Sequence, residues 1–148
     1  MYKKVLIATD GSELANKAVR SGLDLAKEIN AHVALVTVTE PWPVADLAAM
    51  AEMGDKDPVG QYEALIREAA RSALDAAGQI AAEVGIGCEQ VHVKDEYPAS
   101  GILETAETTG TDLIVVASHG RRGLNKMLLG SVANEVVTKS TIPVLVIR

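Results

Sequence analysis

Four runs of apolar residues, rich in β-branched side chains, constrain the fold of this chain more than any other feature of its sequence. They span residues 4–9, 32–39, 112–118 and 143–148, and each is nearly continuous rather than alternating. An uninterrupted run of this kind is typical of a strand that is buried on both faces. A fifth run, residues 89–95, does alternate. We therefore place it near an edge of the sheet.

Helical patterns lie between these runs. The patterns cover residues 12–29, 63–84, 100–108 and 131–140. Strands that alternate with helices predict a parallel sheet with right-handed crossovers and with helices on both faces. The first two patterns each place an apolar stripe along one side of the helix. These stripes are Leu14, Ala18, Leu25 and Ile29 in the first, and Ile66, Ala69, Ala73, Ile80 and Val84 in the second.

Length and composition bound the class of protein. The 148 residues are 48% hydrophobic, which suffices for one domain spanning residues 1–148. The chain has no Phe, one Trp and three Tyr, so its core is expected to be aliphatic. A net charge of -6 gives no general reason to bind nucleic acid or an anionic membrane. Any site for an anion must therefore be local.

Cysteine usage and the N-terminus point to one compartment. Cys88 is the only cysteine, which excludes an intrachain disulfide and favours a reduced, intracellular environment. The apolar run near the N-terminus has only five residues, too few for a signal peptide or a membrane span. We expect a cytoplasmic protein that does not enter membranes.

Residues 40–60 interrupt the alternation of strands and helices. The segment contains three prolines, two glycines and two methionines. A connection of this length is often a lid or a contact surface. A short packed helix around residues 45–53 is the equal alternative.

The first polar segment to follow a predicted strand is residues 8–13. Asp10 or Ser12 is expected to cap the next helix, with Glu13 completing a capping box. In an open parallel sheet, however, ligands bind outside the carboxyl ends of the strands, where the strand order reverses. Asp10 is therefore both a capping candidate and a ligand candidate.

The second polar segment follows the strand at residues 112–118 and runs to the start of the last helix. Gly120, Gly123 and Gly130 permit close approach of a ligand to the backbone. Gly130 and Ser131 stand where the helix begins, so their N–H groups and the Ser131 hydroxyl are predicted to donate to a phosphate. This arrangement predicts an anion site.

Cations accompany these glycines. Arg121, Arg122 and Lys126 supply positive charge, and arginine is able to bind phosphate oxygens through two parallel hydrogen bonds. The alternative for either arginine is a solvated basic loop. His119 has two interpretations as well, a phosphate or proton-transfer group, or a neutral histidine bonded to the backbone.

The standard catalytic and nucleotide signatures are missing from the sequence. It contains neither G-x-x-x-x-G-K-[ST] nor a G-x-G-x-x-G after the first strand, and no serine, histidine and acid triad has supporting context. The chemistry that the residues offer is phosphate binding. We assign no catalytic residue.

Residues 5–13, 112–137 and 143–148 together resemble the universal stress protein family, and the likeness covers essentially the whole chain. The nucleotide-binding branch of that family carries a glycine, two residues, a second glycine, nine residues, and then glycine followed by Ser or Thr. Gly120, Gly130 and Ser131 occupy the later positions, and Ala117 occupies the first.

The resemblance implies an open five-stranded parallel sheet of the Rossmann-like, adenine nucleotide alpha hydrolase-like class. It implies Mg-ATP as ligand, with Asp10 on the ribose or metal side and the Val38 backbone reading adenine. The last strand, residues 143–148, is expected at a sheet edge, where an unpaired apolar edge invites pairing, and the resemblance implies a homodimer through it. The expected nucleotide-binding residues are Ala8, Thr9, Asp10, Val38, Ala117, His119, Gly120, Arg121, Arg122, Gly130, Ser131 and Val132.

Three functions remain open at this point. The leading one is a dimeric, ATP-binding regulatory module that acts on an unidentified partner protein during stress. A slow ATPase or a protein that phosphorylates itself, for example on Ser131, is the second. A nucleotide-free interaction module is the third.

Overall fold

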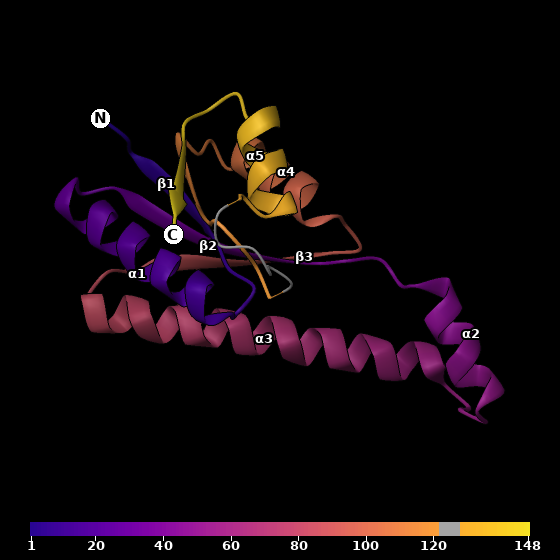
Figure 1. Cartoon of the computed structure of the whole chain (residues 1–148). Helices are drawn as coiled ribbons and strands as arrows, with labels where there is room; N and C mark the ends of the chain where they lie inside the picture. Colours follow the sequence, from indigo (N-terminus) through magenta and orange to yellow (C-terminus); the bar gives the residue numbers. More distant parts are fainter. Residues whose placement is uncertain (122–127) are drawn as a thin grey trace.

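Five parallel strands form one sheet in the order β3-β2-β1-β4-β5 (Figure 1). The computed structural model describes residues 1–121 and 128–148. This confirms the predicted five-stranded parallel sheet with helices, and the structure also has the alternating run at one edge. The strands are β1 (Lys4–Ala8), β2 (His32–Thr39), β3 (Cys88–Lys94), β4 (Leu113–Ala117) and β5 (Val144–Ile147).

Strand β5 differs from the burial that its continuous apolar run predicts. All four of its residues are only partly buried, whereas the first four residues of β4 are fully buried. The reason is position, because β5 pairs with β4 on one side and forms the second edge of the sheet.

The described residues contain five helices, four of which cover the two faces of the sheet. They are α1 (Glu13–Glu28), α2 (Val44–Glu52), α3 (Pro58–Val84), α4 (Pro98–Thr108) and α5 (Ser131–Lys139). Helices α1 and α3 pack on one face, and α4 and α5 pack on the other (Figure 1). In the part of the chain that is described, no helix is both long enough and apolar enough to cross a bilayer.

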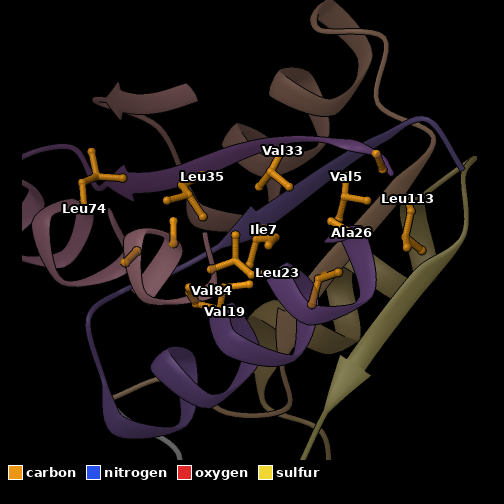
Figure 2. Packing of buried hydrophobic residues seen from close by; sticks show 14 residues of the cluster. Val5, Ile7, Val19, Leu23, Ala26, Val33, Leu35, Leu74, Val84 and Leu113 are labelled. Atoms are coloured by element: carbon orange, nitrogen blue, oxygen red, sulfur yellow. The ribbon is translucent and has the colours of Figure 1, made fainter. Parts of the chain in front are cut away.

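Side chains of the strands alternate between the two cores. Val5 and Ile7 of β1 face α1 and α3, where Val19 and Leu23 of α1 pack against them (Figure 2). Leu6, between them in sequence, belongs to the opposite core. Burial of each such aliphatic side chain contributes about 1.5–3 kcal/mol, so both faces of β1 stabilise the centre of the sheet.

The buried stripes of the two long helices lie beside the predicted ones. In α1 the buried residues are Ala15, Ala18, Val19, Gly22, Leu23 and Ala26. In α3 they are Ala70, Ala73, Leu74, Ala77, Ala81 and Val84. Ala18, Ala73 and Val84 are predicted correctly, whereas Leu14, Leu25 and Ile29 are only partly buried and Ala69 is exposed. Four of the six buried residues in each helix are alanine or glycine, and these small side chains let the helices lie close to the sheet.

Residues 40–60 do contain the short helix that was one of the two alternatives. It is α2, and none of its side chains, all of which are described, is buried. The prediction of a packed helix is therefore wrong about the packing. An edge-to-face contact between Trp42 and Tyr62, with ring centroids 6.3 Å apart, joins the segment before α2 to α3.

Candidate functional site

The strand order reverses between β1 and β4. From β1 the chain continues to β2 and β3 on one side, and from β4 it continues to β5 on the other. Connections therefore leave the carboxyl ends of these two neighbours in opposite directions, which opens the crevice where ligands of such sheets bind. Both polar segments that the sequence singles out begin at this point.

Asp10 connects the loop after β1 to the loop after β4. Its Oδ1 accepts a hydrogen bond from the Ser12 backbone N–H at 2.9 Å, and its Oδ2 accepts one from the Arg121 backbone N–H at 3.0 Å. Hydrogen bonds to a carboxylate are among the stronger ones in proteins. This single side chain thus fixes two loops that are 111 residues apart in sequence.

Ser12, and not Asp10, caps α1. Its Oγ accepts a hydrogen bond from the Ala15 N–H at 3.2 Å. Glu13 is consequently the first residue of the helix, whereas a capping box needs the acid at the third position. The predicted capping box with Glu13 is wrong, and Asp10 has no capping role in α1.

Two glycines let the loops approach each other. A Cβ atom on Gly120 would lie 2.8 Å from Asp10 Oδ2, closer than real Cβ contacts. Gly11 has φ +79, which favours glycine, and a Cβ there would lie 3.0 Å from the Arg121 guanidinium. The Arg121 side chain therefore lies against the turn that follows β1.

The start of α5 is tied to the end of β4. Gly130 is the N-cap residue, and its N–H donates to the Ser118 carbonyl oxygen at 2.7 Å. That donor is already used, so the prediction that the Gly130 N–H binds phosphate is wrong. The N–H groups of Ser131 and Val132, in the first turn, are the ones directed out of the helix start. Ser131 is exposed, and Val132 is partly buried.

His119 is held by its neighbour. Its Nδ1 lies 3.0 Å from the Oγ of Ser118, which is itself buried. The partner is thus a hydroxyl side chain, where the sequence suggested the backbone. Ala117 ends β4 in register with Ile147 of β5. Its extended conformation is open to every residue type, so this position of the motif does not need glycine for its backbone.

Strand β2 extends beyond β1 at the same edge of the sheet. Ala8 pairs with Val36, and the Thr9 N–H donates to the Val36 carbonyl at 2.9 Å. Main-chain groups of alternate residues in a strand face the same neighbour. The N–H and carbonyl of Val38 therefore face the β1 side, past the last residue of β1. The Val38 side chain points elsewhere, against Gly101 of α4.

The structure brings most of the predicted residues to one edge of the sheet. The ends of β1 and β4 and the start of α5 together hold Ala8, Thr9, Asp10, Ala117, His119, Gly120, Arg121, Gly130, Ser131 and Val132. Val38 lies one strand away from β1 on β2. Arg122 lies outside the described residues, as do Gly123 and Lys126.

Two residues at this edge of the sheet, Ser118 and Gly11, were not predicted as part of the site. Ser118 accepts from Gly130 and contacts His119, and Gly11 makes room for Arg121. The Asp10-Gly11 pair is a turn signal that identifies the glycine. Ser118 gives no such signal, because its role depends on where α5 begins.

Acidic ligands for a metal are sparse at this edge. Within residues 1–121 and 128–148, no three His, Cys, Asp or Glu side chains group closely enough to hold an ion. Asp10 is the carboxylate that faces both loops. One carboxylate fits Mg²⁺ that arrives with nucleotide phosphates better than it fits an ion held by protein alone.

Residues 1–148 match the universal stress protein family. The chain belongs to this family. It is 34% identical over 150 residues to the universal stress protein MJ0531 of Methanocaldococcus jannaschii, covering 100% of this chain and 83% of that protein.

Solved structures of the family are similar along the whole chain. The structure of MJ0577, a universal stress protein of Methanocaldococcus jannaschii, has a TM-score of 0.78 at 30% identity, covering 99% of this chain and 96% of that one. A universal stress protein in complex with cAMP has a TM-score of 0.72 at 26% identity, covering 99% and 97%. These relatives share the fold of the chain, and one of them holds an adenine nucleotide.

Proposed function

We propose that this universal stress protein is a cytoplasmic, ATP-binding regulatory module. The observation that carries the proposal is that Asp10 fastens the loops after β1 and β4 together beside the first turn of α5. The cAMP complex of a relative supports an adenine nucleotide as the class of ligand. ATP with Mg²⁺ is the species we infer within that class.

The phosphates would lie at the start of α5. Unpaired N–H groups of a helix start and the positive end of its dipole attract anions. The Ser131 hydroxyl and the Arg121 side chain, which lies across the turn after β1, add a donor and a positive charge. His119, placed by Ser118, stands beside them. Together these groups supply hydrogen-bond donors and local positive charge for a polyphosphate, although the whole chain has a net charge of -6.

The nucleoside would extend from Asp10 toward β2. Each Asp10 oxygen accepts one backbone hydrogen bond and keeps acceptor capacity for a ribose hydroxyl or for Mg²⁺ carried by the phosphates. The Val38 main chain offers one donor and one acceptor past the end of β1, the pattern that an adenine edge requires. Ala8 and Thr9 would line the floor between them.

The test is a calorimetric titration of nucleotide-free protein with Mg-ATP, followed by chromatography of the nucleotide over several hours. Saturable binding with intact ATP is the expected result. Release of ADP would favour the slow ATPase, and absence of binding at millimolar ATP would leave the nucleotide-free interaction module.

Variants locate the site within that titration. Gly120→Ala should weaken binding, because its Cβ displaces the Asp10 carboxylate. Asp24→Asn, which removes an exposed carboxylate from α1, is the matched control and should bind normally. Ala117→Gly should tighten binding if the methyl group crowds the phosphates. Equal affinities for Gly120→Ala and the parent protein would contradict the proposed position of the nucleotide.

We further propose a homodimer through residues 143–148. β5 is a sheet edge, and the Pro143 and Ile147 carbonyls accept hydrogen bonds from Ile114 and Ser118 on the β4 side. By alternation, the main-chain groups of Val146 face outward, where a second β5 is able to pair. Val146→Pro removes an outward N–H and keeps the β4 ladder. Sedimentation at micromolar concentration should show a dimer for the parent protein and a monomer for Val146→Pro; a monomeric parent would contradict the proposal.

A further inference from the structure

Residues 44–68 form an arm that leaves the body of the protein. The arm consists of α2, the turn after it and the first eleven residues of α3. Figure 1 shows α2 and the start of α3 extending past the sheet, with α2 at a steep angle to α3. The first buried residue of α3 is Ala70, and every side chain of α2, a helix that is described throughout, is outside the core.

Several large apolar side chains on the arm are exposed to solvent. Of nine such exposed side chains in the described residues, four lie on the arm: Met53 is 88% exposed, Val44 79%, Leu65 68% and Val59 38%. Single exposed hydrophobic residues are common, but a concentration of them on one segment makes that segment a candidate interaction surface. The arm thus offers apolar anchors that the rest of this chain does not cover.

The arm also holds most of the net charge of the protein. Residues 44–68 contain six acidic and two basic side chains, a net charge of -4 out of -6 for the whole chain. The other residues are close to neutral, with 14 acidic and 12 basic side chains. A surface of this kind attracts a partner of opposite charge and repels one of the same sign.

Local contacts fix the shape of the arm before any partner binds. Trp42 packs edge to face on Tyr62 at 6.3 Å between ring centroids. Asp57 caps α3 by accepting the Gly60 N–H at 3.0 Å, and the Gln61 side chain donates to Asp55 Oδ1 at 2.5 Å. A surface that is ordered in advance loses less entropy on binding.

We infer that the arm is a docking surface for an amphipathic helix with a lysine- or arginine-rich polar face on another protein. Its apolar side chains would contact the leucine-like face of that helix, and its acidic side chains would pair with the flanking cations. Charge decides between the occupants. Two arms of net charge -4 would repel each other, which disfavours a second copy of this chain, and an anionic membrane would repel the arm as well.

The probe is a synthetic helical peptide made only of leucine and lysine, with the leucines along one face. A peptide of the same composition whose order scatters the leucines around the helix is its control. Fluorescence of Trp42, the only tryptophan, reports binding from the base of the arm. No nucleotide is added, so failure here is separate from failure of the ATP proposal. Saturable binding of the first peptide, weakened by added salt, is expected.

Two double variants locate the binding surface. Leu65→Ser with Met53→Ser removes apolar anchors, and Glu63→Lys with Glu68→Lys reverses charge; all four positions are exposed, so the fold should persist. Each should lower affinity by about tenfold or more, as expected when a central anchor or a charge pair is lost. Tyr97→Ser with Glu104→Lys changes exposed residues outside the arm and should leave affinity unchanged.

Three results would overturn the inference. They are the absence of saturable binding, equal binding of the scattered peptide, and equal losses in the arm and control variants. Sedimentation of the same variants tests the second copy directly. If the arm variants dissociated a dimer of the parent protein, the occupant would be another copy of this chain and the inference would be wrong.

Discussion

The two halves of α3 share one helix and have opposite surroundings. From Ala70 to Val84, residues at helical spacing are buried against β2 and α1, and four of the six are alanines. From Pro58 to residue 69, larger side chains such as Leu65 stand in water. The helical pattern is continuous across both halves. Whether a stripe is buried therefore depends on how far the sheet extends beneath it, which periodicity alone does not encode.

The largest expected effect is a buried charge at Ala77 in the covered half of α3. Ala77 is fully buried, so Ala77→Asp places an unpaired carboxylate in an aliphatic core. It should lower the free energy of unfolding by about 4 kcal/mol or more. Ala64→Asp, on the exposed half of the same helix, should cost about 0.5 kcal/mol. Urea denaturation measures both. Similar losses would show that the first half of α3 is packed after all.

Replacing one leucine in each half of α3 should give a smaller difference in the free energy of unfolding. Leu74 is 7% exposed and Leu65 is 68% exposed. Leu74→Ala should lower the free energy of unfolding by about 2–3 kcal/mol, because it leaves a cavity beside α1 and β2. Leu65→Ala should change it by about 0.5 kcal/mol or less. Thermal unfolding of the pair is the check, and a comparable shift in Tm for Leu65→Ala would indicate a contact within the chain.

Asp112 lies in the body of the protein and should make the stability of the protein sensitive to acid. Partial burial raises the pKa of Asp112. Hydrogen bonds from the Lys3 and Lys4 backbone N–H groups, at 2.8 and 2.9 Å, one from its own backbone N–H and the positive N-terminus together lower it by more, so this pKa lies below its ordinary value. A lowered folded-state pKa stabilises the protein above the unfolded value of about 3.9 and loses that contribution as pH falls through the folded one. Asp112→Asn should therefore be less stable than the parent protein at neutral pH, and the difference should shrink in acid. A constant difference from pH 7 to pH 2 would refute this role.

Helix caps give the smallest expected contrast. Ser12 caps α1 on the body, and Asp57 caps α3 on the arm. Ser12→Ala should cost about 1 kcal/mol of global stability, whereas Asp57→Ala should mainly fray the first turn of α3. Amide hydrogen exchange distinguishes the two. Faster exchange throughout the core in Asp57→Ala would mean that the arm unfolds together with the body.

The fold could be predicted from the sequence because strands buried on two faces leave continuous apolar runs. The edge position of residues 89–95 followed from their alternation. The burial of β5 could not be predicted in this way, since an apolar edge strand and a central strand have the same pattern. The exposure of the arm could not be predicted for a related reason, because the helical pattern of α3 continues past the point where the sheet ends.

The site was predictable as a pair of segments and less so in its contacts. Asp10, Gly120 and Ser131 lie at the predicted strand and helix ends. The capping box failed because Ser12 starts the helix two residues after Asp10. The use of the Gly130 N–H by Ser118 and the outward main chain of Val38 depend on register, which the sequence does not state.

The most direct test of the central claim is hydrogen–deuterium exchange of the whole chain with and without Mg-ATP. The account predicts slower exchange at residues 8–12, at residues 117–121 and in the first turn of α5. The exchange rates of the arm, residues 44–68, should not change, because the nucleotide does not contact it. Protection confined to the arm, with exchange at Asp10 and Ser131 unaffected by saturating ATP, would contradict a nucleotide site between β1 and β4.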